Sequence, residues 1–292
     1  MNMRKLVLLL ILAIIYKVPS SISQDLMGSL GTDSSTTKDF TKATFKTTHL
    51  VIGQSSETVA KGDLNFIISH HFGKVNEGVY TLFGLDQSTI RLGLEYGLNR
   101  RLSVGVGRSS YQKTYDGYLK FKILRQRKSG IPLTVTYFGE MTINSMKWAD
   151  PLRKNFFSSR LDYVNQLLIA SKVNTKFSIQ LMPSHVHKNL VKLKADPNDI
   201  YAMGGGMRYK IVKRLSVNAE YYYLLTNKTA KDFKNSFSIG VDMETGGHVF
   251  QLFFTNSHPL FERGFISETE GSWKKGDIFF GFNITRTFTI AK

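Results

Sequence analysis

The sequence predicts an all-β protein, an antiparallel transmembrane β-barrel of about twelve strands, from three observations. Apolar and polar residues alternate along many segments after residue 62, most of them about 10 to 14 residues long, whereas soluble strands usually have about 5 or 6. Long and short connections alternate between these segments. No run of about 18 apolar residues follows Gln24, so any membrane crossing must use strands.

The N-terminus has the layout of a signal peptide. Arg4 and Lys5 precede an apolar run over residues 6–15, and small residues follow up to Ser23. The run is too short for a helix that spans about 30 Å of hydrocarbon. We therefore predict that residues 1–23 are removed on export, that residues 24–62, rich in Ser, Thr and Lys, form a flexible periplasmic lead-in, and that residues 63–292 form the barrel.

Alternation identifies the strands, because successive side chains of a strand point to opposite faces. Leu92 and Leu94, for example, alternate with Arg91 and Glu95. The expected strands lie near residues 63–73, 88–98, 101–110, 115–125, 131–143, 157–172, 175–187, 199–212, 214–226, 236–245, 247–257 and 276–290.

The connections between the expected strands give the orientation. Long ones, at 74–87, 144–156, 188–198, 227–235 and 258–275, alternate with short ones, and only the third, at 111–114, departs from the rule. Outer-membrane barrels have short periplasmic turns and long outer loops. A soluble β-sandwich has no reason to alternate in this way, so the pattern predicts the cell outer membrane.

The short connections are basic. They and their edges contain Arg100, Arg101, Arg125, Arg127, Lys128, Lys172, Lys176, Lys213 and Arg214. Each basic residue beside an anionic lipid surface can gain about 1 kcal/mol, so we expect a periplasmic rim that contacts outer-membrane lipids. The formal net charge of +17 falls by three with the signal peptide, and export excludes nucleic acid as the partner of so basic a chain.

The polar face of the strands predicts a charged lumen. Its expected basic residues are Arg91, Lys120, Lys122, Arg160, Arg208 and Lys210, and its expected acidic residues are Glu95, Asp116, Glu140, Asp162, Glu220, Asp242 and Glu244. A twelve-stranded barrel is wider than the eight-stranded kind that side chains fill and narrower than a sixteen-stranded porin. Nearly balanced charge therefore leaves two alternatives, ion pairs that plug the lumen or a narrow wet channel for small polar solutes.

Four stretches carry a family resemblance. Residues 90–109 (IRLGLEYGLNRRLSVGVGRS), 115–126 (YDGYLKFKILRQ), 244–257 (ETGGHVFQLFFTNS) and 276–288 (GDIFFGFNITRTF) resemble an uncharacterised family of bacterial β-barrel proteins, domain of unknown function 5777. The resemblance extends from about His70 to the C-terminus. It implies an outer-membrane barrel, and the family supplies no catalytic residues to carry over.

Several groups of residues have the chemistry needed for catalysis or metal binding. Ser184, His185 and His187 lie close together, as do Ser257 and His258, with His248 nearby in the chain, and a lipid hydrolase needs a Ser and a His on one face. Ser184 and His185 are neighbours on a strand and should face opposite ways. Adjacent histidines at 70 and 71 likewise diverge, so together with His187 they predict no metal site, and we expect no cofactor. Glycines at 105, 107 and 204–206 precede no helix and therefore predict close approaches inside the barrel rather than a phosphate site.

These patterns predict an outer-membrane barrel that acts without catalysis, either as a narrow channel for small polar solutes or as a plugged scaffold with a charge-paired lumen. One alternative is an outer-membrane lipid hydrolase that uses a Ser/His pair at the rim. Another is a soluble lipocalin-like binder, which would need an apolar lumen. Protein partners are not indicated by any motif.

Overall fold

The structure is a computed structural model that describes residues 40–148, 150–191, 193–226 and 233–291. The expected signal peptide, and the lead-in as far as residue 39, lie outside these residues. Among the described residues, no helix is both long enough and apolar enough to cross a membrane.

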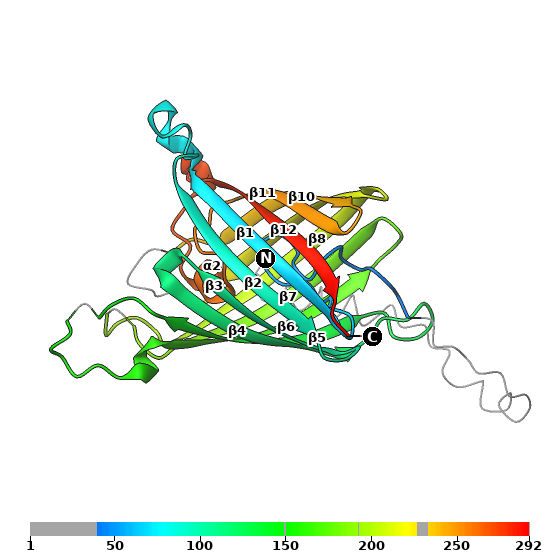
Figure 1. Ribbon diagram of the computed structural model, residues 1–292, viewed down its shortest axis with the longest axis horizontal. Coiled ribbons are helices and arrows are strands. Elements are labelled where there is room, and N and C mark those ends of the chain that lie inside the picture. The colour runs from blue at the N-terminus through cyan, green and yellow to red at the C-terminus, as the bar shows by residue number, and fades with distance from the viewer. Residues whose placement is uncertain (1–39, 149, 192, 227–232, 292) are drawn as a thin grey trace, which may run out of the picture. The chain divides into compact units, whose positions relative to one another are not determined.

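Twelve antiparallel strands form one closed barrel, which confirms the predicted fold class. They are β1 (Asp63–Lys74), β2 (Ser88–Gly97), β3 (Leu102–Ser109), β4 (Thr114–Leu124), β5 (Thr134–Asn144), β6 (Leu161–Lys172), β7 (Phe177–Lys188), β8 (Asp199–Val212), β9 (Leu215–Leu224), β10 (Ser236–Thr245), β11 (His248–Thr255) and β12 (Phe279–Thr289). Each strand pairs with its neighbours in sequence, and β1 pairs with β12 to close the barrel (Figure 1). Closure satisfies the hydrogen bonds of every strand, which a membrane requires.

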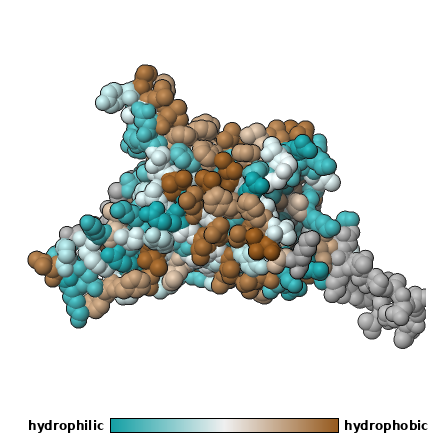
Figure 2. Space-filling view, in the orientation of Figure 1, coloured by the Kyte–Doolittle hydropathy of each residue, from teal (hydrophilic) through white to brown (hydrophobic). Residues whose placement is uncertain are grey.

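The two faces of the barrel differ in polarity. In β2, Leu92 and Leu94 are 45% and 42% exposed on the outside, whereas Arg91 and Glu95 are buried inside. Apolar side chains point outward from the other strands as well, among them Val104, Leu119, Met141, Leu167, Leu181, Met207, Ile239 and Leu252. Figure 2 shows such hydrophobic residues gathered over the strands of the visible face. An apolar outer face around a polar interior is the arrangement of a membrane barrel and the reverse of a lipocalin-like binder.

The connections define two ends of the barrel. The short-turn end holds residues 98–101, 125–133, 173–176, 213–214 and 246–247. The long-loop end holds, among the described residues, 75–87, 110–113, 145–148, 150–160, 189–191, 193–198, 225–226, 233–235 and 256–278. Short helices lie at the long-loop end: η1 (Val75–Glu77), η2 (Val79–Thr81), η3 (Tyr111–Lys113), η4 (Phe157–Arg160), α2 (Glu262–Ser267) and η5 (Trp273–Lys275). The strand expected from residue 157 begins instead at Leu161, because η4 occupies the preceding four residues.

Residues 40–62, which we call the plug, fold inside the barrel and correct the expectation of a flexible lead-in. Phe45, Leu50, Val51 and Ile52 are each at most 5% exposed. The plug enters at the short-turn end, where the Thr41 amide donates to the Gln126 carbonyl (2.9 Å), and returns to it at Gly62. Its tip is a hairpin in which the Leu50 amide donates to the Gly53 carbonyl (2.8 Å) and residues His49 and Gln54 form a bridge.

The loop 256–278 enters the lumen from the long-loop end, although the sequence predicts an outer loop here. All six residues of α2 are buried. Phe265 and Ile266 of α2 share an apolar cluster with Leu50 and Val51 of the plug tip and with Tyr222 of the wall. Two segments that enter from opposite ends therefore meet inside the barrel.

Two glycines allow this close approach. A Cβ on Gly206 of β8 would lie 2.1 Å from Leu50 Cδ2, and a Cβ on Gly53 would lie 2.3 Å from the Tyr222 hydroxyl. Side chains at these positions would displace the plug. Gly204 and Gly206 thus mark where the lumen has no room for a side chain, whereas a Cβ on Gly205 would meet nothing within 4 Å.

Candidate functional site: the occupied lumen

The structure places most of the expected lumen residues on the inner wall. Ten are buried there, namely Arg91, Glu95, Asp116, Lys120, Lys122, Glu140, Asp162, Arg208, Glu220 and Asp242. Lys210 and Glu244 are only partly buried and lie toward the short-turn ends of β8 and β10. The expected position of Arg160 on the inner wall must be corrected. Arg160 lies in η4, before β6 begins, and its guanidinium donates to the Asn144 and Met146 carbonyls (2.6 Å each).

One buried ion pair joins two strands of the wall. The Arg91 Nε of β2 donates to Asp116 Oδ1 of β4 at 2.9 Å, and a second bond joins the Nη2 to Oδ2. Gly107 of β3 lies between them, and a Cβ there would be 2.5 Å from the Arg91 Nη2. Glycine is therefore required where the guanidinium crosses the strand. The bidentate geometry favours a pair that is fixed in position.

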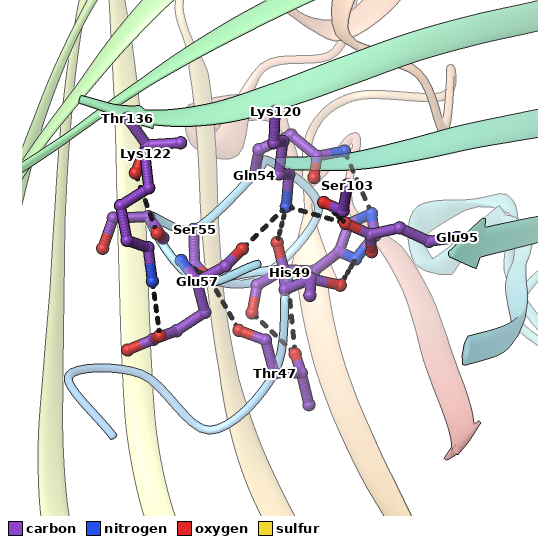
Figure 3. Close-up of polar contacts among 12 residues, drawn as sticks. Thr47, His49, Gln54, Ser55, Glu57, Glu95, Ser103, Lys120, Lys122 and Thr136 are labelled. Atoms are coloured by element: carbon purple, nitrogen blue, oxygen red, sulfur yellow. Dashed lines mark hydrogen bonds and ion pairs between the residues drawn. The ribbon is translucent and has the colours of Figure 1, made fainter. Parts of the chain in front are cut away.

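The lysines of β4 contact the plug more closely than they contact the wall (Figure 3). Lys120 Nζ donates to the Thr48 carbonyl at 2.7 Å, whereas Glu95 Oε1 lies 3.7 Å away. Lys122 Nζ lies 3.3 Å from Glu57 Oε2 of the plug. The balanced wall charges expected to pair among themselves are thus partly used to bind an inserted segment.

The carboxyl group of Glu220 holds the tip of the plug. Its Oε1 accepts the amides of Ile52 (2.9 Å) and Gly53 (3.0 Å), and its Oε2 accepts the amide of Val51 (3.2 Å). An irregular backbone that is buried needs partners for its amides. One wall side chain satisfies three of them.

Amide side chains of the wall bind the remaining polar groups of the plug tip. Gln180 accepts the Ser56 amide and donates to the Gln54 carbonyl, both at 2.8 Å. Asn283 Nδ2 donates to the Val51 carbonyl at 2.8 Å. These contacts could not be expected from the sequence, because Gln180 and Asn283 are uncharged residues on an unremarkable polar face.

A second ion-pair network holds α2. Arg263 Nε lies 2.8 Å from Asp162 Oδ2 of β6, and Glu268 pairs with both Arg263 and Lys188 of β7. Burial acts to raise the pKa of Glu268, but Arg263 and Lys188 outweigh it and lower that pKa to about 2. Glu268 therefore stays ionised at any physiological pH. Neither Arg263 nor Glu268 is indicated by the sequence, because their loop is expected to lie outside the barrel.

The basic rim surrounds the short-turn end and also contacts the plug. Arg125 and Arg127 lie over the ring of Phe40, 4.0 and 5.3 Å from its centroid, and Lys172 Nζ donates to the Lys42 carbonyl at 2.8 Å. Exposed basic residues at this end are Arg100, Arg101, Lys128, Lys176, Lys213 and Arg214. Three rim residues therefore also hold the base of the plug.

The groups considered for catalysis do not converge. Ser184 is buried in the lumen, where its hydroxyl accepts from Gln166 (2.8 Å), whereas His185 and His187 lie on the outer face and both contact Asp199 Oδ1 (2.8 Å each). His258 Nε2 contacts the Thr89 hydroxyl (2.8 Å), not a serine. Across the described ranges, no cluster of three or more His, Cys, Asp or Glu side chains suits a metal ion.

Two cavities lie at opposite ends of the barrel. One of about 300 Å³ is lined at the short-turn end by Lys46, Glu57 and Asp63, among others. Another of about 560 Å³ is lined at the long-loop end by Lys188, Phe233 and Arg263, among others. Within the part of the chain that the structure describes, the two share no lining residue. The plug tip and α2 lie between them.

Fold and site together define a membrane-bound β-barrel whose lumen is filled by two inserted segments. Residues 45–288 match the family described as a membrane bound beta barrel domain (DUF5777), and the chain belongs to this family. The match begins at residue 45, so the family domain includes most of the plug. No curated protein matches the sequence.

Solved barrels resemble the chain at low identity. The NanC porin is 8% identical with a TM-score of 0.47, over 78% of this chain and 100% of that one. The KdgM porin is 9% identical with a TM-score of 0.45, over 78% and 99%. The outer membrane phospholipase A from Escherichia coli is 10% identical with a TM-score of 0.41, over 77% and 89%. The first two are porins and the third is a phospholipase.

Proposed function

We propose that this protein is a non-catalytic outer-membrane barrel that is closed at rest and passes small polar solutes when the plug is withdrawn. The observation that supports this proposal is that the plug is hydrogen-bonded to a polar wall and is not one of the twelve paired strands. The plug enters and leaves by the same end, so withdrawal of its buried part breaks no pairing among the twelve barrel strands. The vacated wall would be polar and would therefore fill with water.

The outer membrane and the orientation belong to the same proposal. The signal-like residues 1–23 and the alternating connections support export, with the short-turn end and its basic rim in the periplasm. Of the expected lumen residues, four basic and six acidic ones are buried, and Lys188 of β7 adds a fifth buried cation, so an open pore should be only weakly ion-selective. Contacts with outer-membrane lipids through the rim are part of this proposal.

Conductance in planar bilayers tests the proposal. The unmodified protein should conduct little, and a variant that lacks residues 44–58 should conduct more. Because α2 also occupies the lumen, a second variant adds replacement of residues 259–271 by a Gly-Ser linker, and it should conduct most. A scaffold is the correct reading if both variants fold as heat-modifiable barrels and neither conducts.

A cross-link gives the matched control. The chain has no cysteine, and Lys46 of the plug contacts Glu244 of β10 near the short-turn end. Lys46→Cys and Glu244→Cys together can be joined by a short bifunctional thiol reagent. Linking should suppress openings that occur in the same double variant before linking. Openings that persist unchanged would mean that withdrawal of the plug does not open the barrel.

A further inference from the structure

Two carboxyl groups meet where α2, the plug and the wall come together. Glu140 of β5 and Glu262 of α2 are 4% and 2% exposed, and the backbone amide of Arg263, the residue next to Glu262, lies 3.4 Å from Glu140 Oε2. The side chain of Gln54, from the plug, also acts electrostatically on Glu262. This contact therefore joins both inserted segments to the barrel.

The pair needs a proton. Two carboxylates that repel each other in one buried site do not readily both ionise, because neither charge is solvated. Glu140 Oε1 and Glu262 Oε1 are buried, and neither accepts a hydrogen bond from a donor among the described residues. A proton shared between the two groups supplies the missing donor. The Arg263 amide reaches only the other oxygen of Glu140, Oε2, at 3.4 Å.

The surrounding charges do not replace that proton. The groups that act on the pair from neighbouring strands are Arg91 of β2, Asp116, Tyr118 and Lys120 of β4, and Glu220 and Tyr222 of β9. Both cations already have partners, Arg91 with Asp116 and Lys120 with the Thr48 carbonyl and Glu95. Burial, the largest influence, raises the pKa of Glu262.

The other titratable groups of the inserted segments behave differently. Burial lowers the pKa of His49 in the plug well below its usual value and also lowers that of His258 in the loop. Both imidazoles are therefore neutral when the pH rises above 7. Glu268, with its pKa of about 2, stays ionised. These three groups therefore do not account for a response above pH 7, and glutamine variants of Glu140 and Glu262 identify the pair.

We infer that Glu140 and Glu262 form a proton-binding site that holds α2 inside the barrel, and that loss of the proton releases the loop 256–278 from the lumen. The inference rests on the proposed function only in that release of α2 would open the long-loop end. The inserted state binds one proton more than the released state at pH values above the usual glutamate pKa. Insertion is thus most stable at low pH and weakens as the pH rises, by up to about tenfold in the inserted-to-released ratio per pH unit.

Thiol labelling tests this inference without any need for conductance. Ser267 of α2 is fully buried, and Ser267→Cys places the only cysteine of the chain there. The rate of reaction with a membrane-impermeant maleimide is measured from pH 5.5 to pH 8.5 in proteoliposomes. Each rate is divided by that of Lys274→Cys, an exposed position in the same loop, which removes the titration of the thiol itself.

The normalised rate should rise with pH in the Ser267→Cys protein. Adding Glu262→Gln should remove the rise, because a glutamine amide donates to Glu140 without titrating, and Glu140→Gln should act in the same way. Glu270→Gln, which changes an exposed acid of the same loop, should leave the rise intact. A rate independent of pH, or a rise unchanged by both glutamine variants of the pair, overturns the inference. Either result would leave the plug and its conductance test unaffected.

Discussion

Glu220→Ala provides a direct test of how the plug is held. The substitution removes the acceptor of three buried amides, those of Val51, Ile52 and Gly53. The strand pairing of β9 does not use this side chain, so the barrel itself should remain folded. The substitution should shift the equilibrium from the inserted plug toward the withdrawn plug.

The three hydrogen bonds to Glu220 set the expected loss of stability of the inserted plug. A hydrogen bond to a carboxyl oxygen contributes about 1 to 2 kcal/mol net, so three give about 3 to 6 kcal/mol. We expect the inserted plug to lose at least about 3 kcal/mol, which raises the withdrawn population about a hundredfold. Glu220→Gln keeps Oε1, which accepts from Ile52 and Gly53, and loses only the acceptor for Val51, so about tenfold is expected.

The assay uses a buried reporter. Ser56 is 1% exposed and its hydroxyl has no hydrogen-bond partner within the described chain, so Ser56→Cys should be tolerated. Its rate of reaction with a maleimide in detergent-purified protein reports withdrawal of the plug. Heat-modifiable migration on a gel checks that the barrel is intact. Equal reactivity with Glu220, Gln or Ala at this position would refute the reasoning.

Three further predictions test the faces, the lumen and the orientation. Leu92→Arg on the apolar outer face should destabilise the barrel by about 2 to 4 kcal/mol, whereas Asn174→Arg in a short turn should cost little; urea titration into lipid vesicles measures both, and equal costs would contradict the assigned faces. Arg91→Ala should lower the free energy of unfolding of the barrel by about 3 to 5 kcal/mol, because it leaves Asp116 buried without its cation. Replacing both residues, Arg91→Met with Asp116→Leu, should recover most of that loss. A double variant as unstable as Arg91→Ala would mean that the unpaired carboxylate is not the cause. On intact cells, Lys275→Cys should react with an impermeant thiol reagent and Asn174→Cys should not, and the reverse pattern would invert the orientation.

The strands follow from the sequence because alternation is a local property. Leu92 and Arg91 are neighbours in the chain and lie on opposite faces whatever the rest of the barrel does. The same local signal identifies twelve strands and their alternating connections. The strands predicted from this signal are wrong only at their ends, as at residues 157–160, where η4 takes the place of the expected first residues of β6.

The two segments that fill the lumen could not be predicted from the alternation of residues. The plug has neither the period of a strand nor that of a helix, so it resembles a flexible segment until wall side chains satisfy its backbone. The loop around α2 looks like any long outer loop, and only the closed barrel shows that Phe265 meets Tyr222, with ring centroids 5.2 Å apart.

The sequence by itself therefore determined the barrel class and, away from strand ends such as residues 157–160, the strands and which of their residues face inward, because each depends on the alternation of adjacent residues. Only the tertiary structure decided which inward groups pair with each other and which bind an inserted segment. Lys120 and Glu220 are placed inward by their position in a strand. Their partners, Thr48 and residues 51–53, lie more than 70 positions away in the chain and come within hydrogen-bonding distance only when the barrel closes around the plug.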